Sequence, residues 1–320
     1  MKIGIFTVLY NELKLEKVLE YVSKLGYEAV EIAAWKGSNH IDIDKILSGG
    51  ATEYKKTVEK YGLIISGLSN HLEGQLVLGP HDESTDEWFK GTPEEKIKYG
   101  MERMKKTAEA AAALDVPVVN GFIGSPNWGA WYIFPPGNEK IFEKGFEIFA
   151  ERWNEILDVF AAHGIKFAHE VHPQEQAYNI ETAEQALKAI NERKEFGFNF
   201  DPSHLVWQGI DPVVFIKKFG KRIYHAHAKD AEIVKENVST SGVIPTGAWM
   251  RPGRGFRFRV VGWGDVEWKR VMTALLEVGY DYVLSYEHED PVMSREDGCE
   301  KCIAFLKPLI IKAPLKQVWW

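Results

Sequence analysis

Four ionisable residues of this chain stand at or next to the ends of short apolar segments. The segments IKFAHE, FGFNFD, RIYHAHA and YVLSYE carry Glu170, Asp201, His227 and Glu287. Each segment has the length and apolar character of a buried β-strand. An ionised side chain there is costly unless something pairs with it. Three carboxylates and one imidazole that meet at one point would bind one divalent metal ion. We favour Mn²⁺, with Mg²⁺, Co²⁺ or Zn²⁺ as alternatives.

Two histidines compete for the imidazole position. His225 and His227 are two residues apart in HAHAKD, so they face the same side of a strand. His227 lies nearer the carboxyl end of the strand, where the chemistry of such folds takes place. We therefore predict that His227 is the ligand, and that His225, one layer below, packs in the core or supports the ligands.

These segments belong to an alternation of strands and helices along the whole chain. Eight strand-like segments begin near residues 2, 29, 63, 116, 165, 196, 222 and 282. Helical patterns occupy residues 13–25, 43–61, 93–114, 139–163, 182–192, 212–219, 266–278 and 294–311. Eight such units without a long linker predict an α/β fold, a single (β/α)8 TIM barrel over residues 1–320. A doubly wound open sheet is the alternative, but no glycine-rich dinucleotide fingerprint follows the first strand.

Three connections between a strand and the next helix are long, at residues 71–92, 122–138 and 230–265. Barrel enzymes build their active sites from these connections at the C-terminal face, so we place the functional face there. Aromatic side chains are abundant in the loops, and flat apolar rings suit the C–H-rich face of a sugar. We take Trp128 as the candidate aromatic contact. His71, which follows the third strand across the mouth, is a further candidate for substrate contact.

Composition restricts the classes of partner. The formal net charge of −7 disfavours a nucleic-acid partner. No apolar run reaches the roughly 18 residues of a membrane span, and the first residues are typical of a strand and not of a signal peptide. Cys299 and Cys302 have no second pair with which to bind zinc, so we interpret them as reduced thiols of a cytoplasmic protein.

Several motifs in the second half of the chain resemble a known family. They are HEVHP, NFDPSHL, HAHAKD, PGRG, GWGDVEW and LSYEHED, with SNH at residues 69–71 in the first half. The chain resembles the xylose isomerase-like barrel superfamily of sugar isomerases and epimerases, which includes ketose 3-epimerases and AP endonucleases. The motifs are fairly specific for the superfamily and carry little information about the substrate.

The resemblance implies roles for individual residues. Glu170, Asp201, His227 and Glu287 would be the metal ligands, and Glu170 and Glu287 would also be the catalytic acid/base pair. His204 and Arg251 would contact the substrate. Ketose epimerases carry a sugar-binding Glu after their first Glu ligand. Here that stretch reads VHPQEQ, so the resemblance implies that His172, Glu175 or Gln176 takes this place, and we name His172 as the candidate.

Such a site supports proton transfer next to a carbonyl. The metal would polarise the carbonyl of a chelated sugar, and one carboxylate would remove the neighbouring proton to give an enediolate. Return of the proton by the second carboxylate gives an epimer, and return elsewhere gives an aldose–ketose isomer. We therefore predict a metal-dependent sugar epimerase or isomerase that acts on a small sugar or sugar derivative. The alternative is an eliminase or deglycosidase that acts on 3-keto sugars or glycosides.

Two further classes are less favoured. An AP endonuclease would need more histidines after the seventh strand than this chain has, and a barrel that binds sugar without turnover would not need both glutamates. The segment RPGRGFRFR has four arginines that would suit a phosphate, but we prefer a solvated loop whose acidic partners lie elsewhere. The aromatic C-terminus, Val318, Trp319 and Trp320, indicates docking onto the barrel or onto a second subunit, so a homo-oligomer remains an alternative.

Overall fold

Eight parallel strands close into a barrel in the computed structural model, which describes residues 1–244 and 246–315. The closed order is β1-β10-β7-β6-β5-β4-β3-β2, and the predicted (β/α)8 fold is confirmed. The strands are β1 (Lys2–Phe6), β2 (Ala29–Ala33), β3 (Ile64–Ser69), β4 (Val118–Gly121), β5 (Lys166–Glu170), β6 (Phe196–Phe200), β7 (Ile223–Ala228) and β10 (Val283–Tyr286). The predicted docking of Val318, Trp319 and Trp320 lies outside the described residues.

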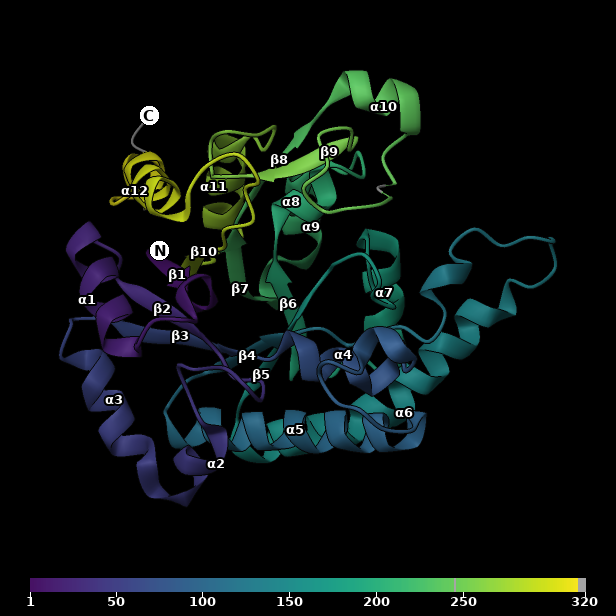
Figure 1. Cartoon of the computed structure of the whole chain (residues 1–320), viewed down its shortest axis with the longest axis horizontal. Helices are drawn as coiled ribbons and strands as arrows, with labels where there is room; N and C mark the ends of the chain where they lie inside the picture. The colour runs from purple at the N-terminus through teal and green to yellow at the C-terminus, as the bar shows by residue number, and fades with distance from the viewer. Residues whose placement is uncertain (245, 316–320) are drawn as a thin grey trace.

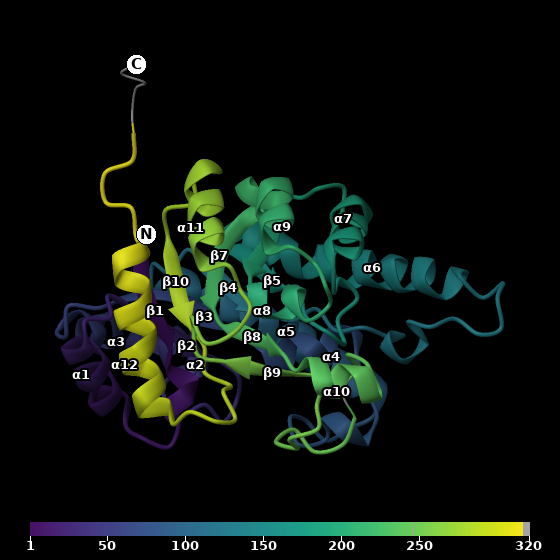
Figure 2. The same cartoon turned by 90° about the horizontal axis from the view of Figure 1, so that it is seen from above.

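Helices cover the outside of the barrel (Figures 1 and 2). They are α1 (Leu15–Leu25), α2 (Ile43–Lys45), α3 (Ala51–Glu59), α5 (Pro93–Ala113), α6 (Lys140–His163), α7 (Ile180–Ala189), α9 (Pro212–Phe219), α11 (Trp268–Glu277) and α12 (Arg295–Leu306). The first turn of α5 is fixed by a capping box, in which Thr92 and Glu95 satisfy each other's backbone N–H groups. Among the described residues, no helix combines the length and apolar composition that crossing a membrane requires.

Glycines end two of these helices where the chain must turn back into the barrel. Gly26 follows α1 with φ of 95°, and Gly164 follows α6 with φ of 69°. A residue with a side chain is strained in this left-handed region, so glycine is favoured there. The next strands, β2 and β5, can therefore begin within a few residues.

The three long connections contain secondary structure of their own. Residues 71–92 begin with α4 (His71–Leu78), and residues 230–265 contain the strands β8 (Asp230–Ile233) and β9 (Phe256–Arg259) with α10 (Lys235–Ser241) between them. Strands β8 and β9 pair antiparallel and form a ribbon outside the barrel sheet. The ribbon lies beside α8 (Pro202–Val206) in both views (Figures 1 and 2). The N-terminal part of α6 and the loop before it project away from the barrel.

A buried carboxylate fixes the return from this ribbon to the barrel. Asp230 accepts hydrogen bonds from the backbone N–H groups of Ala231, Gly262 and Val266 and from Trp268 Nε1, each at 2.9 Å. Burial raises the pKa of Asp230 above its usual value. The four donors compensate for the burial of this side chain. Asp230 thus holds the segment GWGDVEW in one conformation.

Candidate metal centre

The ends of four adjacent barrel strands bring the predicted ligands together. Glu170 is the last residue of β5, Asp201 follows β6, His227 lies in β7 and Glu287 follows β10. One ligand atom from each of the four lies within 4.8 Å of all the others. Parallel pairing explains the convergence, because Glu170 is opposite Asn199, Asn199 is opposite His225, and each ligand lies near the same end of its strand.

His227 Nδ1 faces the three carboxylates. It lies 3.0 Å from Glu170 Oε2, 3.2 Å from Glu287 Oε2 and 3.9 Å from Asp201 Oδ2. Among the described residues, His227 Nδ1 and Asp201 Oδ2 are buried and have no partner in hydrogen-bond geometry, although Lys229 Nζ lies 3.2 Å from Asp201 Oδ2. Buried polar atoms without partners are rare in folded proteins. A divalent cation would satisfy both atoms, so the donor set fits the predicted metal.

The other ring nitrogen of His227 is held by a residue that the sequence analysis missed. Glu31, in the middle of β2, is fully buried, and its two carboxylate oxygens lie 3.1 and 3.2 Å from His227 Nε2. Asn120 Nδ2 donates to Glu31 Oε1 at 2.9 Å. Burial alone would raise the pKa of Glu31, but attraction to His227 and His225 outweighs burial and lowers it to about 2. An ionised Glu31 therefore orients the ring so that Nδ1 faces the carboxylates.

Lys229 is a second functional residue that the sequence analysis missed. Its buried ammonium group lies 2.6 Å from Glu287 Oε2, 2.9 Å from Glu289 Oε2 and 3.2 Å from Asp201 Oδ2. Burial would lower the pKa of Lys229, but the attraction of Asp201 and Glu287 raises it well above its usual value. The ammonium group offsets part of the negative charge of the cluster and restrains Glu287.

Three nitrogen-bearing side chains surround the carboxylate of Glu170. His71 Nε2 lies 3.1 Å from Oε2, and His204 Nε2 lies 3.1 Å from Oε1. Asn199 Nδ2 donates to Oε2 at 3.1 Å. Burial would raise the pKa of Glu170, but His227, His204 and His71 lower it well below its usual value. The structure thus places the predicted substrate contacts His71 and His204 beside the predicted catalytic base.

The other predicted contacts lie around this cluster. The ring of His172 meets the ring of His204 edge-on, with centroids 4.2 Å apart. Trp128, in the short 3₁₀ helix Trp128–Ala130, packs edge-on against Tyr178 with centroids 4.9 Å apart. Arg251 lies in the loop before β9. Substrate contact by His172, Trp128 and Arg251 stays a prediction.

Residues near the site also have supporting positions. His225 Nδ1 lies 3.0 Å from Asn199 Oδ1, and its Nε2 lies 3.3 Å from Ser66 Oγ, in the layer below the ligands. Glu175 accepts from the backbone N–H groups of Ile123 and Gly124 at 2.8 and 2.7 Å. Burial raises the pKa of Glu175 to about 8. Glu175 therefore anchors the loop after β4 instead of facing the four ligands.

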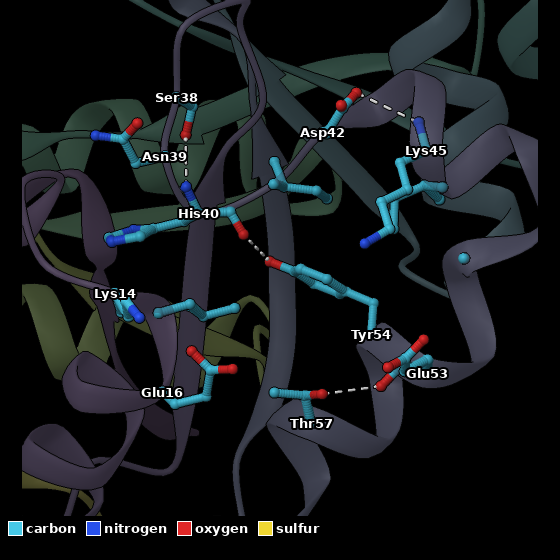
Figure 3. A pocket seen from close by; sticks show the side chains of 14 residues that line it. Lys14, Glu16, Ser38, Asn39, His40, Asp42, Lys45, Glu53, Tyr54 and Thr57 are labelled. Atoms are coloured by element: carbon cyan, nitrogen blue, oxygen red, sulfur yellow. Dashed lines mark hydrogen bonds between the residues drawn. The ribbon is translucent and has the colours of Figure 1, made fainter.

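A separate hollow of about 500 Å³ lies at the edge of the barrel (Figure 3). It is lined by the start of α1, the loop after β2, and α3, and Tyr54 donates a hydrogen bond to the carbonyl of His40 within it. Both nitrogens of His40 already face protein oxygens, Thr7 Oγ1 and the carbonyl of Leu13, at 3.1 Å. The residues that line this hollow include none of the four predicted metal ligands.

Comparison with known proteins places the chain among sugar-modifying barrels. The family described as xylose isomerase-like TIM barrel matches residues 19–309. An uncharacterized protein of Bacillus subtilis, YfiH, is 27% identical over 97% of this chain and 99% of its own length. An inosose dehydratase of Bacillus thuringiensis is 29% identical over 45% of this chain and 50% of its own length. A fructoselysine 3-epimerase of Escherichia coli O157:H7 is 29% identical over 40% of this chain and 46% of its own length.

Proposed function

Because this chain belongs to the family of xylose isomerase-like TIM barrels, we propose that it is a divalent-metal-dependent sugar epimerase or isomerase. The observation that carries the proposal is the position of His227 Nδ1, which lies within 3.2 Å of both Glu170 and Glu287. The fructoselysine 3-epimerase relative supports a reaction of this type. Glu170, Asp201, His227 and Glu287 would hold the ion. Mn²⁺ is the ion we propose, because oxygen-rich donor sets suit it.

The proposed chemistry is a proton transfer between two glutamates and the carbon next to a carbonyl. A cation held by the four residues would polarise the substrate carbonyl and make the neighbouring C–H bond more acidic. Glu170, fixed by His71, His204 and Asn199, is positioned to hold the proton that leaves this carbon. The C–H electron pair then moves into the C–C bond, and the carbonyl oxygen gains the charge.

Glu287 completes the reaction in this proposal. Lys229 Nζ lies 2.6 Å from Glu287 Oε2 and restrains this side chain. Glu287 follows β10, which lies on the other side of β7 from β6 and β5, the strand that carries Glu170. A proton on Glu287 returned to the same carbon from the other face gives the epimer. A proton returned to the former carbonyl carbon, with transfer of the hydroxyl proton between the two neighbouring oxygens, gives the aldose–ketose isomer. The buried surroundings exclude bulk water, which strengthens the electrostatic effect of each group.

Elimination is the second candidate reaction. Several relatives are named inosose dehydratase, which favours loss of water next to a carbonyl. The same first step serves both reactions, because removal of the proton prepares the adjacent carbon to expel a substituent. In that case Glu287, or a neighbouring acid, would give its proton to the leaving oxygen.

Product identification tests the proposal and separates the two reactions. Metal-stripped protein is reloaded with Mn²⁺ and incubated with free ketoses, sugar phosphates, cyclic polyol ketones and 3-keto glycosides, and the products are identified by NMR. A new epimer or isomer without loss of mass supports the proposal. Release of water or of an aglycone shows that the elimination candidate is correct. Absence of any product from the whole panel, with metal bound, contradicts both.

A further inference from the structure

The segment RPGRGFRFR carries four arginines, and the structure divides them into two pairs. Arg257 and Arg259 lie on β9 and have acidic partners: Arg257 Nε is 2.7 Å from Glu232 Oε2, and Arg259 Nε is 2.9 Å from Asp290 Oδ2. These two agree with the expectation that acidic partners lie elsewhere in the chain, although they sit in a β-ribbon and not in a solvated loop.

The other pair, Arg251 and Arg254, has no such partner. Among residues 1–244 and 246–315, no carboxylate lies within 4.0 Å of either guanidinium group. Arg254 is only 7% exposed, and its guanidinium stacks 4.4 Å from the ring centre of Trp249 and 5.4 Å from that of Phe256. Arg251 Nε is buried and, within the described part of the chain, lacks a hydrogen-bond partner.

The positive charges of Arg251 and Arg254 repel each other. Burial lowers the pKa of Arg254, and the neighbouring charge of Arg251 lowers it further. Two adjacent cations, one of them largely buried, are costly without a counter-charge. This arrangement stands out in a chain whose formal net charge is −7. An anion bound between the two guanidinium groups would remove the cost.

Hydrogen bonds that its backbone carbonyls accept hold the loop with Arg251 and Arg254 in place. Asn237 Nδ2, on α10, donates to the carbonyls of Pro252 at 2.7 Å and Arg254 at 2.9 Å. Val234 N donates to the carbonyl of Gly255 at 2.9 Å. These bonds fix the main chain on both sides of Arg254, so the guanidinium groups are positioned before any ligand arrives.

A continuous set of rings connects this pair to the metal centre. The ring of Trp249, which Arg254 covers, lies 5.6 Å from the ring of Phe258. Phe258 in turn lies 4.7 Å from Lys229 Nζ and 5.1 Å from the ring of His204. Lys229 and His204 both contact the proposed metal ligands. Trp249 and Phe258 therefore form a chain of contacts from Arg254 to the side chains around the candidate metal centre.

We propose that Arg251 and Arg254 bind an anionic group of the substrate, a phosphate ester or a carboxylate, while its carbonyl end occupies the metal centre. This inference rests on the proposed function and specifies its substrate class. The planar guanidinium group matches the paired oxygens of both anions, and an aromatic platform holds that group flat. The substrate is thus an acidic sugar derivative and not a neutral sugar.

Binding of inorganic phosphate to the metal-free protein tests the site without any turnover. Isothermal titration calorimetry compares the wild type with Arg254→Gln and Arg251→Gln, and Arg257→Gln serves as the matched control because Arg257 already has an acidic partner. Each of the first two changes should weaken binding about ten- to a hundred-fold, as expected for loss of a charge-assisted hydrogen bond. The control should stay within about two-fold of the wild type. Phosphate binding that is absent, or that survives Arg254→Gln unchanged, overturns the inference.

Turnover distinguishes failure of this inference from failure of the proposed function. With Mn²⁺ bound, kcat/KM is compared for a ketose phosphate, a sugar acid and the matching neutral ketose. Preference for one anionic substrate that falls at least about ten-fold in Arg254→Gln supports the inference and identifies which anion is bound. Equal use of neutral and anionic substrates overturns it but leaves the proposed function intact. Arg254-dependent phosphate binding without turnover of any substrate refutes the proposed function and keeps the anion site.

Arg254→Lys and thermal melts separate loss of anion binding from loss of the fold. Arg254→Lys keeps the charge but loses the planar pair of donors, so its affinity for phosphate should lie between those of the wild type and Arg254→Gln. Thermal melts of all variants establish that they are folded. A lysine variant as weak as the glutamine variant, with an unchanged melt, would mean that the positive charge of residue 254 is not what binds the anion.

Discussion

At the residue scale, the arrangement depends on how His227 is oriented. Its Nε2 lies against Glu31, so its Nδ1 faces Glu170, Asp201 and Glu287. A carboxylate behind a ligating imidazole fixes the ring and makes it a better donor. Glu31 thus supports the candidate metal centre, although it is not one of the four predicted ligands.

Replacement of Glu31 tests this orientation. Glu31→Gln keeps the size of the side chain but removes its charge, and we expect Mn²⁺ affinity to fall about 10- to 100-fold. Glu28→Gln is the matched control, because Glu28 is exposed and lies just before the start of the same strand. Calorimetric titration with Mn²⁺ measures both. Equal affinities of the two variants would show that Glu31 does not support His227.

Replacement of Glu170 or Glu287 tests the proposed proton transfer. Glu170→Gln and Glu287→Gln should each lower kcat by about 10²- to 10⁴-fold, because each removes a proton carrier, and each should weaken metal binding. Steady-state rates and metal titrations measure the two effects separately. Glu300→Gln, on an exposed part of α12, should leave both unchanged. Near-normal turnover by either active-site variant with metal bound would contradict the two-carboxylate mechanism.

The sequence could predict some of these residues and not others. Glu170, Asp201 and Glu287 were visible because each ends an apolar run. Glu31 was not singled out, although a carboxylate inside the apolar run AVEIA is itself a signal of a buried charge. Lys229 was not singled out either. It follows His225 and His227 on the same face of the strand, but its acidic partners come from other strands, and the sequence does not show that these lie close to it.

At the element scale, the β8–β9 ribbon carries the candidate anion site and lies outside the barrel pattern. Glu232 on β8 accepts from Arg257 on β9, where the two residues are direct partners in the ladder. The sequence prediction for RPGRGFRFR was a solvated loop, whereas Arg257 and Arg259 lie on β9. Charged side chains without an apolar run gave no strand signal, and the partner strand is more than 20 residues away.

Acid should weaken this ribbon in a defined way. Arg257 lowers the pKa of Glu232 below its usual value, and Arg259 lowers it further. The stabilisation is therefore fully present above the pKa of the unfolded chain and is lost as pH falls through the lower pKa of the folded state. We expect Glu232→Gln to reduce the free energy of unfolding by about 0.5–1 kcal/mol at pH 7, because the pair is partly exposed.

Urea unfolding at pH 7 and at pH 3 measures this effect. The difference between the wild type and Glu232→Gln should shrink at pH 3, because this pH lies below the ordinary pKa of a glutamate, so the unfolded chain takes up a proton there and stability that depends on the ionised Glu232 is lost. Glu236→Gln, on α10, provides the control. A difference that stays constant or grows in acid would contradict the assigned role of the Glu232 charge.

At the scale of the whole molecule, the barrel explains why ligands far apart in sequence meet. Glu31 and Glu287, which contact His227 from opposite ends of the chain, come together because β1 pairs with both β2 and β10 and so closes the sheet. The repeated strand–helix pattern was enough to predict this closure. The internal structure of the long connections could not be predicted, because it depends on contacts such as those of Asp230. The oligomeric state stays a prediction.

Metal binding should stabilise the whole fold. A ligand that binds only the folded state adds about 2.7 kcal/mol at a free concentration one hundred times its Kd. We expect the metal-stripped protein to remain folded, since Lys229 offsets part of the carboxylate charge, and Mn²⁺ to raise its Tm. His227→Ala should lose most of this rise. A Tm that is indifferent to Mn²⁺ in the wild type would mean that the four residues do not hold the ion.

Deuterium exchange is the decisive test of metal-dependent proton transfer by Glu170. The protein reloaded with Mn²⁺ is incubated in D₂O with the substrate panel, and NMR follows the hydrogen on the carbon next to the carbonyl. We predict that deuterium enters at that carbon and that an epimer or isomer forms. The exchange should be lost in Glu170→Gln and after removal of the metal. Product formation without any uptake of deuterium, or exchange that persists in Glu170→Gln with metal bound, would contradict it.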